Sequence, residues 1–98
     1  MYKLNEQDAL KLTKVLNYKT INEVRFEKNG MELNIEETLH CTAFCFSDIM
    51  ILAIQSTHST FKVRIDLSKG SYYYSLSNDS LLIQDTNLLC FESYEFLF

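Results

Sequence analysis

The segment from Glu23 to Glu36 carries the strongest folding signal in this chain, an Asn29-Gly30 pair between two runs of alternating apolar and polar residues. Asn-Gly favours a two-residue type I′ turn, because both residues accept the positive φ that this turn requires. A two-residue turn fixes the register of a hairpin. Lys28 therefore pairs with Met31, and every further pair follows by counting.

This register predicts one apolar face and one acidic face. The apolar pairs are Val24 with Ile35 and Phe26 with Leu33. On the other face Glu27 lies opposite Glu32, and Glu23 lies opposite Glu36. Like charges directly opposite one another destabilise a sheet. Two interpretations fit such pairs. Either the hairpin is a solvated edge whose charges resist aggregation, at a small cost in stability, or the negative field of the glutamates attracts a basic partner.

Length and composition predict one well-ordered domain over residues 1–98. Hydrophobic residues make up 47% of the 98, which is ample for a core in a domain of this size. The chain has no proline and only two glycines. Long irregular loops are therefore not expected, because these two residues concentrate in loops.

The formal charge of −4 is unevenly distributed along the chain. Residues 1–22 carry four lysines and two carboxylates, whereas residues 23–48 carry two basic residues and six carboxylates. An acidic surface disfavours DNA, RNA and anionic membranes as direct partners. A protein with a basic cleft is the partner that this charge pattern favours.

Cysteine usage and the N-terminus favour a cytoplasmic protein. Cys41, Cys45 and Cys90 are an odd number of cysteines, and the first residues resemble a charged helix rather than a signal peptide. The apolar run over residues 49–54 is far shorter than the roughly 20 residues that a membrane-spanning helix needs.

The fold class predicted from periodicity is α+β. Asn5 with Asp8 resembles a capping box, and Ala9, Leu12 and Leu16 form an apolar stripe, so we expect an amphipathic helix over about residues 5–18. From about residue 20 to 98 the period becomes two, as in a β meander. We expect the helix to pack on a curled, mostly antiparallel sheet of seven to eight strands, or on a partial barrel.

Two parts of the meander are less regular than the rest. The strands expected at 38–46 and 49–55 are apolar on both faces, which predicts a central pair covered on both sides. Residues 88–98 fit a strand or a helix, because Leu88, Phe91 and Tyr94 also recur at helical spacing. We favour the strand, since Phe, Tyr and Cys are strand formers.

No combination of residues predicts catalysis, a metal or a cofactor. Cys41 and Cys45 would lie about 13 Å apart on one face of a strand, too far for a disulfide. They are expected to be structural thiols, and His40 and His58 belong to no nucleophile pattern. We therefore do not expect an enzyme.

The Tyr72-Tyr73-Tyr74 run fits three interpretations. Aromatic packing within a sheet is the ordinary one, and an interface tyrosine is the next. A base-stacking platform near Lys62 and Arg64 ranks last, because nine basic residues are outnumbered by thirteen acidic ones.

The resulting functional hypothesis is a small inhibitor that binds a basic, nucleic-acid-binding enzyme or effector stoichiometrically, as immunity proteins, antitoxins and anti-CRISPR proteins do. The expected binding residues are Glu23, Glu27, Glu32, Glu36 and Glu37, with Tyr73 as an apolar anchor. The alternative is a β module that binds a small molecule or forms an oligomer such as a homodimer. In that case the acidic hairpin is only a solvated edge.

Overall fold

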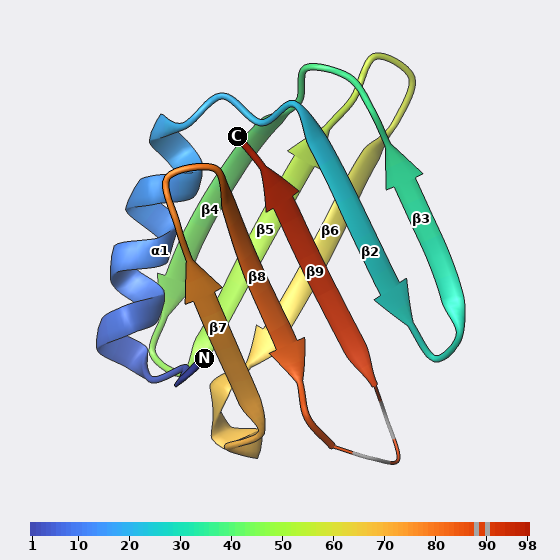
Figure 1. The fold of residues 1–98 in the computed structure, drawn as a ribbon. Coiled ribbons are helices and arrows are strands. Elements are labelled where there is room, and N and C mark those ends of the chain that lie inside the picture. The colour runs from blue at the N-terminus through green and yellow to red at the C-terminus, as the bar shows by residue number, and fades with distance from the viewer. Residues whose placement is uncertain (88, 90) are drawn as a thin grey trace.

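The computed structural model describes residues 1–87, 89 and 91–98 as one helix and two layers of strands (Figure 1). The elements follow in the order β1 (Tyr2–Lys3), α1 (Glu6–Tyr18), β2 (Glu23–Lys28), β3 (Met31–Ile35), β4 (His40–Phe46), β5 (Ile49–Gln55), β6 (Thr60–Asp66), a 3-10 turn η1 (Leu67–Lys69), β7 (Tyr72–Leu76), β8 (Ser80–Asp85) and β9 (Glu92–Leu97).

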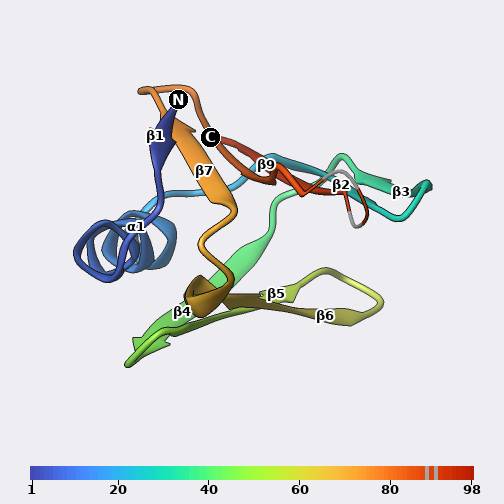
Figure 2. The same ribbon diagram turned by 90° about the horizontal axis from the view of Figure 1, so that it is seen from below.

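The strands form two antiparallel sheets that stack on each other. One sheet has six strands in the order β1-β7-β8-β9-β2-β3, and the other has three in the order β4-β5-β6. Figure 2 shows the two sheets as separate layers, with α1 beside them at the β1 and β4 side. β3 and β6 therefore form the sheet edges on the side away from the helix.

Helix α1 begins at a side-chain cap and closes one side of the sandwich. The Asn5 side chain accepts a hydrogen bond from the Asp8 backbone N–H at 2.8 Å, as an N-cap does. At the other end, the Asn17 amide donates to the Ala43 carbonyl at 2.7 Å and accepts from the Ala43 N–H at 2.8 Å. Asn17 thus satisfies the outward N–H and C=O groups of Ala43 in edge strand β4, which would otherwise be open to pairing with another chain.

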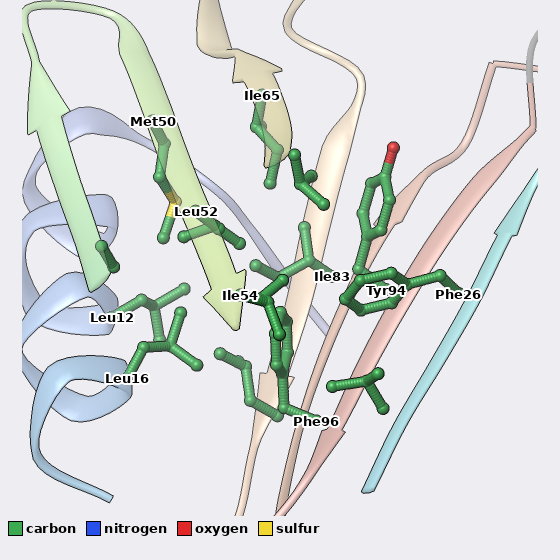
Figure 3. Close-up of a cluster of buried hydrophobic side chains, with 14 of the residues drawn as sticks. Leu12, Leu16, Phe26, Met50, Leu52, Ile54, Ile65, Ile83, Tyr94 and Phe96 are labelled. Atoms are coloured by element: carbon green, nitrogen blue, oxygen red, sulfur yellow. The ribbon is translucent and has the colours of Figure 1, made fainter. Parts of the chain in front are cut away.

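The core fills the space between the layers. Leu12 and Leu16 of α1 point toward side chains of both sheets (Figure 3). The other large side chains with less than 2% exposure include Met50, Leu52, Ile54, Ile65, Leu81, Ile83 and Phe96. A single apolar cluster therefore joins the helix and the two sheets.

The structure confirms the α+β class, the helix and the hairpin register. The β2–β3 pairs run from Lys28 with Met31 to Val24 with Ile35, as the Asn-Gly turn requires. Asn29 and Gly30 both have positive φ, at 53° and 81°.

The prediction of one curled sheet or partial barrel was wrong. Within the described residues, nine strands are divided between two sheets, and neither sheet closes. β9 inserts between β8 and β2, so the end of the chain pairs with the first hairpin. Turn signals predict only pairing between sequence neighbours, and they carry no information on this distant pairing.

The prediction that the 38–46 and 49–55 strands are covered on both sides was also wrong. Only their inner face joins the core, while Phe44 is 51% and Phe46 is 80% exposed. Helix α1 covers the edge of β4 rather than the second face of the sheet. In addition, β6 and β7 belong to different sheets, so Tyr73 does not lie on the strand next to Lys62 and Arg64.

The C-terminal segment is a strand over Glu92–Leu97, as favoured from its residue types. Leu88 and Cys90, which also entered that prediction, lie outside the described residues.

Candidate functional site

The outer face of β2, β3 and β9 gathers four of the glutamates of this protein. Glu23, Glu27, Glu32 and Glu95 alternate with the inward residues of these strands and lie around Arg25. We call this group of five residues the acidic face. In Figure 2 the six-stranded sheet turns this side away from the three-stranded sheet.

Glu27 and Glu32 stand at the β3 end of a cross-strand row. The register places Tyr73, Gln84, Ser93, Glu27 and Glu32 side by side on five neighbouring strands. At about 4.8 Å between strands, Tyr73 lies roughly 14 Å from Glu27 along this row. The structure therefore brings four predicted binding residues onto one sheet face: Tyr73, Glu27 and Glu32 in this row, and Glu23 on the same side of β2.

A shallow hollow lies between the two facing glutamates. It has a volume of about 210 Å³ and is lined by Arg25, Phe26, Glu27, Glu32 and Asn34. Glu27 and Glu32 are direct partners across the hairpin, and both border this hollow. An ammonium or guanidinium group from another molecule would meet two carboxylates there.

Arg25 is already committed to other carboxylates. Its Nε lies 2.7 Å from Glu23 Oε2, and its NH1 lies 3.6 Å from Glu95 Oε1. The hydrogen bond and charge of Glu23, with Glu95 and Glu36 further away, raise the pKa of Arg25 above its ordinary value. Arg25 therefore pairs with Glu23 and Glu95. The two other glutamates of the acidic face, Glu27 and Glu32, have no such contact with Arg25 among the ion pairs of the described residues.

Two predicted binding residues lie outside this face. Glu36 follows the end of β3, where its charge still acts on Arg25. Glu37 Oε1 accepts a hydrogen bond from the Thr57 backbone N–H at 2.8 Å, so this side chain ties the β3–β4 connection to the β5–β6 turn.

Glu95 was missed by sequence reasoning. It joins the acidic face because β9 pairs with β2 and sets Glu95 opposite Arg25. No local turn or residue spacing in the sequence predicts that β9 pairs with β2. The only available signal was the alternation of Glu92, Tyr94 and Phe96 with Ser93, Glu95 and Leu97.

A second acidic group, Glu92, is buried between the sheets. Glu92 accepts hydrogen bonds from the Tyr72 hydroxyl at 2.5 Å and the Tyr94 hydroxyl at 2.9 Å, and the Lys28 ammonium lies 3.4 Å away. Burial raises the pKa of Glu92, but these two hydroxyls and Lys28 outweigh burial and hold the pKa below its ordinary value. Burial and the Glu92 charge raise the pKa of both tyrosines.

Asp85 lies opposite Glu92 in the β8–β9 register and is 1% exposed. Its Oδ1 accepts from the Asn87 backbone N–H at 2.9 Å, and its Oδ2 has no partner among the described residues. Asp85 and Glu92 are too deeply buried to form a docking surface.

The cysteines and histidines form no chemical centre in the described part of the chain. Cys41 and Cys45 are half-buried against the core, and burial raises the pKa of Cys41 to about 11. His40 and His58 are exposed on separate elements. Within residues 1–87, 89 and 91–98, no group of three or more His, Cys, Asp or Glu could hold a metal ion.

The outer side of the three-stranded sheet differs in character from the acidic face. Its rows place Phe44 beside Ile51 and Arg64, and Phe46 beside Ile49 and Asp66. We call Phe44, Phe46, Ile49, Ile51 and Ala53 the apolar face. Exposed patches of this kind commonly mark interaction sites.

Comparisons with protein-family models, curated proteins and solved structures find no match to this chain. Among the described residues, no helix has the length and apolar character needed to cross a membrane.

Proposed function

We propose that this protein acts in the cytoplasm as a stoichiometric inhibitor, and that its acidic face occupies a basic cleft on a nucleic-acid-binding enzyme or effector. Immunity proteins, antitoxins and anti-CRISPR proteins act in this way. Such a role needs neither a catalytic residue nor a cofactor. The partner is a basic protein, and the acidic surface disfavours direct contact with nucleic acid or membrane.

One observation carries the proposal: Glu27 and Glu32 face each other across the hairpin and line one hollow. Facing glutamates cost folding stability. A basic side chain in the hollow would turn that repulsion into two favourable contacts, and charge complementarity of this kind gives specificity and fast association. Tyr73, half-buried in the same row, supplies an aromatic group at the rim.

Reversal of both charges is expected to abolish the complex without harming the fold. The Glu27→Lys/Glu32→Lys double variant should bind its partner at least 100-fold more weakly, since each close charge pair contributes a factor of about ten or more. In the single Glu32→Lys variant, a Lys opposite Glu27 should raise the free energy of unfolding by roughly 0.2–1 kcal/mol. Pull-down from host, phage and competitor lysates at two salt concentrations identifies the partner, and calorimetry then measures the affinity.

The matched control is the Glu6→Lys/Asp79→Lys variant, which has the same net charge but alters exposed residues on α1 and on the β7–β8 turn. It should retain partner binding. Equal binding by both double variants would remove the acidic face from the interface and leave the hairpin as a solvated edge.

A second candidate function, self-association, is favoured by the apolar face. The aromatic C-terminus offers less apolar surface for such pairing, because Phe96 is fully buried within its own chain. If two copies stack their three-stranded sheets about an axis parallel to the strands, Phe44 lies over the partner's β6, where Arg64 can contact its ring. Three strands of seven residues cover only about 300 Å² per copy, well below the roughly 800 Å² of a standard interface.

Self-association through this face is therefore expected to be weak. Sedimentation should show a monomer at micromolar and a dimer at millimolar concentration, and the Phe44→Ser/Phe46→Ser variant should remain monomeric throughout. A dimer of unchanged strength in that variant would place the self-contact elsewhere.

A further inference from the structure

The side of the sandwich away from α1 is open. Helix α1 closes the side at β1 and β4, whereas β3 and β6 diverge on the opposite side (Figure 2). A groove with a volume of about 620 Å³ lies there between the two sheets. Small-molecule sites commonly have volumes of roughly 300–1,000 Å³.

The groove has an apolar floor built from both sheets. Phe26, Leu33 and Tyr94 come from the six-stranded sheet, and Phe61 and Val63 come from β6. The Phe26 and Tyr94 rings pack edge to face with centroids 5.3 Å apart, which fixes that wall of the groove. Leu33 and Phe61 are only half-buried, so part of their apolar surface faces the opening.

The charges at the groove are mostly positive, although the chain as a whole is acidic. Lys28, Lys62 and Arg64 line it against the single carboxylate of Glu32. Lys28 is held by Glu92 at 3.4 Å. Lys62 and Arg64 alternate with the floor residues along β6, so their side chains start from the outer face of this edge strand, and both residues border the mouth of the groove. Neither has an ion-pair partner within 4.0 Å among the residues that the structure describes.

We infer that this groove binds a small organic anion with an apolar body. The apolar body covers the half-buried floor, and the anionic head lies at the mouth of the groove, where the long side chains of Lys62 and Arg64 can reach it around the edge of β6. Arg64 offers the forked donor geometry that suits a carboxylate or phosphate. A cationic or neutral ligand of the same length would leave both positive groups without a partner.

This inference does not rest on the proposed inhibitor function. The groove lies on the inner side of the β2–β3 hairpin, whereas the acidic face lies on its outer side. Only Glu32 and Phe26 border both hollows, and neither is altered in the test below.

The test uses decanoate, below its micellar concentration, as an anionic probe and decylammonium as its cationic counterpart. Calorimetry should show saturable binding of decanoate to one site per chain and no saturable binding of decylammonium. The Lys62→Gln/Arg64→Gln variant should bind decanoate about tenfold more weakly, since two exposed charge contacts are lost. The Lys11→Gln/Lys14→Gln variant removes two exposed helix charges and should bind as the unaltered chain does.

Amide chemical shifts then locate the probe. Changes at Leu33, Phe61 and Val63 support the inference. Changes confined to Phe44 and Ile51 would place decanoate on the apolar face instead and would overturn it. The inference also fails if decanoate does not bind, if decylammonium binds as tightly, or if the Lys62→Gln/Arg64→Gln variant keeps its full affinity.

Discussion

A chain that ends at Glu95 is expected not to fold and to accumulate as insoluble protein. Phe96 is fully buried, and its ring packs on Phe26 with centroids 5.4 Å apart. Truncating a buried Phe to Ala alone costs about 3–5 kcal/mol, out of roughly 5–15 kcal/mol for a whole domain. Loss of residues 96–98 also removes the backbone bonds from Asn22 N–H to the Leu97 carbonyl at 2.7 Å and from Phe98 N–H to the Asp79 carbonyl at 2.9 Å. The soluble fraction and the thermal unfolding curve measure the effect.

Two full-length variants measure how much Phe96 and Phe98 each contribute to the loss of stability. Phe96→Ala should lower the free energy of unfolding by about 3–5 kcal/mol. Phe98→Ala should cost much less, because Phe98 is half-buried and its ring contact with the Lys19 ammonium, 5.7 Å away, is worth about 0.5–1 kcal/mol. A soluble, cooperatively folded chain ending at Glu95 would contradict the central position that β9 has in the sheet.

The parts of the fold that sequence predicts are those that local chemistry determines. The Asn29-Gly30 turn and the alternation around it fix the β2–β3 register without help from the rest of the chain. The Asn5 cap and the apolar stripe of α1 likewise act within one or two turns of helix. These signals are strong because each alternative would strain a turn or expose an apolar face.

Distant pairing is the part that sequence could not supply. β2 and β9 lie more than sixty residues apart, and their pairing depends on the fit of Phe26 against Tyr94 and Phe96. Several strands with alternating residues could have taken the place of β9. For this reason the sequence predicted the binding residues one at a time. Only the fold shows that Tyr73, Glu27 and Glu32 lie in one row, with Glu95 nearby.

The two-sided apolar strands β4 and β5 show a limit of periodicity. A strand covered on both faces and a strand with an exposed interaction patch have the same apolar residue pattern. The difference lies in the number of layers, which depends on where α1 packs. Asn17 ties α1 to the edge of β4 through a polar contact that no hydrophobic pattern reveals.

Replacing Glu92 with alanine is expected to lower the free energy of unfolding by about 2–6 kcal/mol, because each of two buried tyrosine hydroxyls loses its acceptor at a cost of about 1–3 kcal/mol. Glu92 is 5% exposed and accepts hydrogen bonds from the Tyr72 and Tyr94 hydroxyls, with Lys28 close by. Its removal leaves the two buried hydroxyls without an acceptor. Denaturant unfolding at neutral pH measures the loss, and Tyr18→Phe, at a tyrosine with 94% exposure, is the control expected to change nothing.

The same carboxylate should make stability fall in acid. The pKa of Glu92 is lower in the folded protein than its ordinary value of 4.5, so the unfolded chain binds the proton more readily. The stabilisation is therefore complete above about pH 4.5 and is lost as pH falls through the lower, folded pKa. Asp85, the Tyr72 and Tyr94 hydroxyls and the Lys28 ammonium are the titratable groups that accompany it in the cluster.

Three variants distinguish the contribution of Glu92 to the pH dependence of stability from that of the other carboxylates. Glu92→Gln keeps the shape of the side chain but cannot titrate, so its stability should fall less steeply between pH 5 and pH 3 than that of the unaltered chain. Tyr72→Phe and Tyr94→Phe each remove one hydrogen bond to a charged acceptor, which should cost about 1.5–3 kcal/mol at neutral pH. Each should also raise the folded pKa of Glu92 and so reduce the acid dependence. If the free energy of unfolding falls equally steeply with pH in Glu92→Gln and in the unaltered chain, the pH dependence comes from other carboxylates.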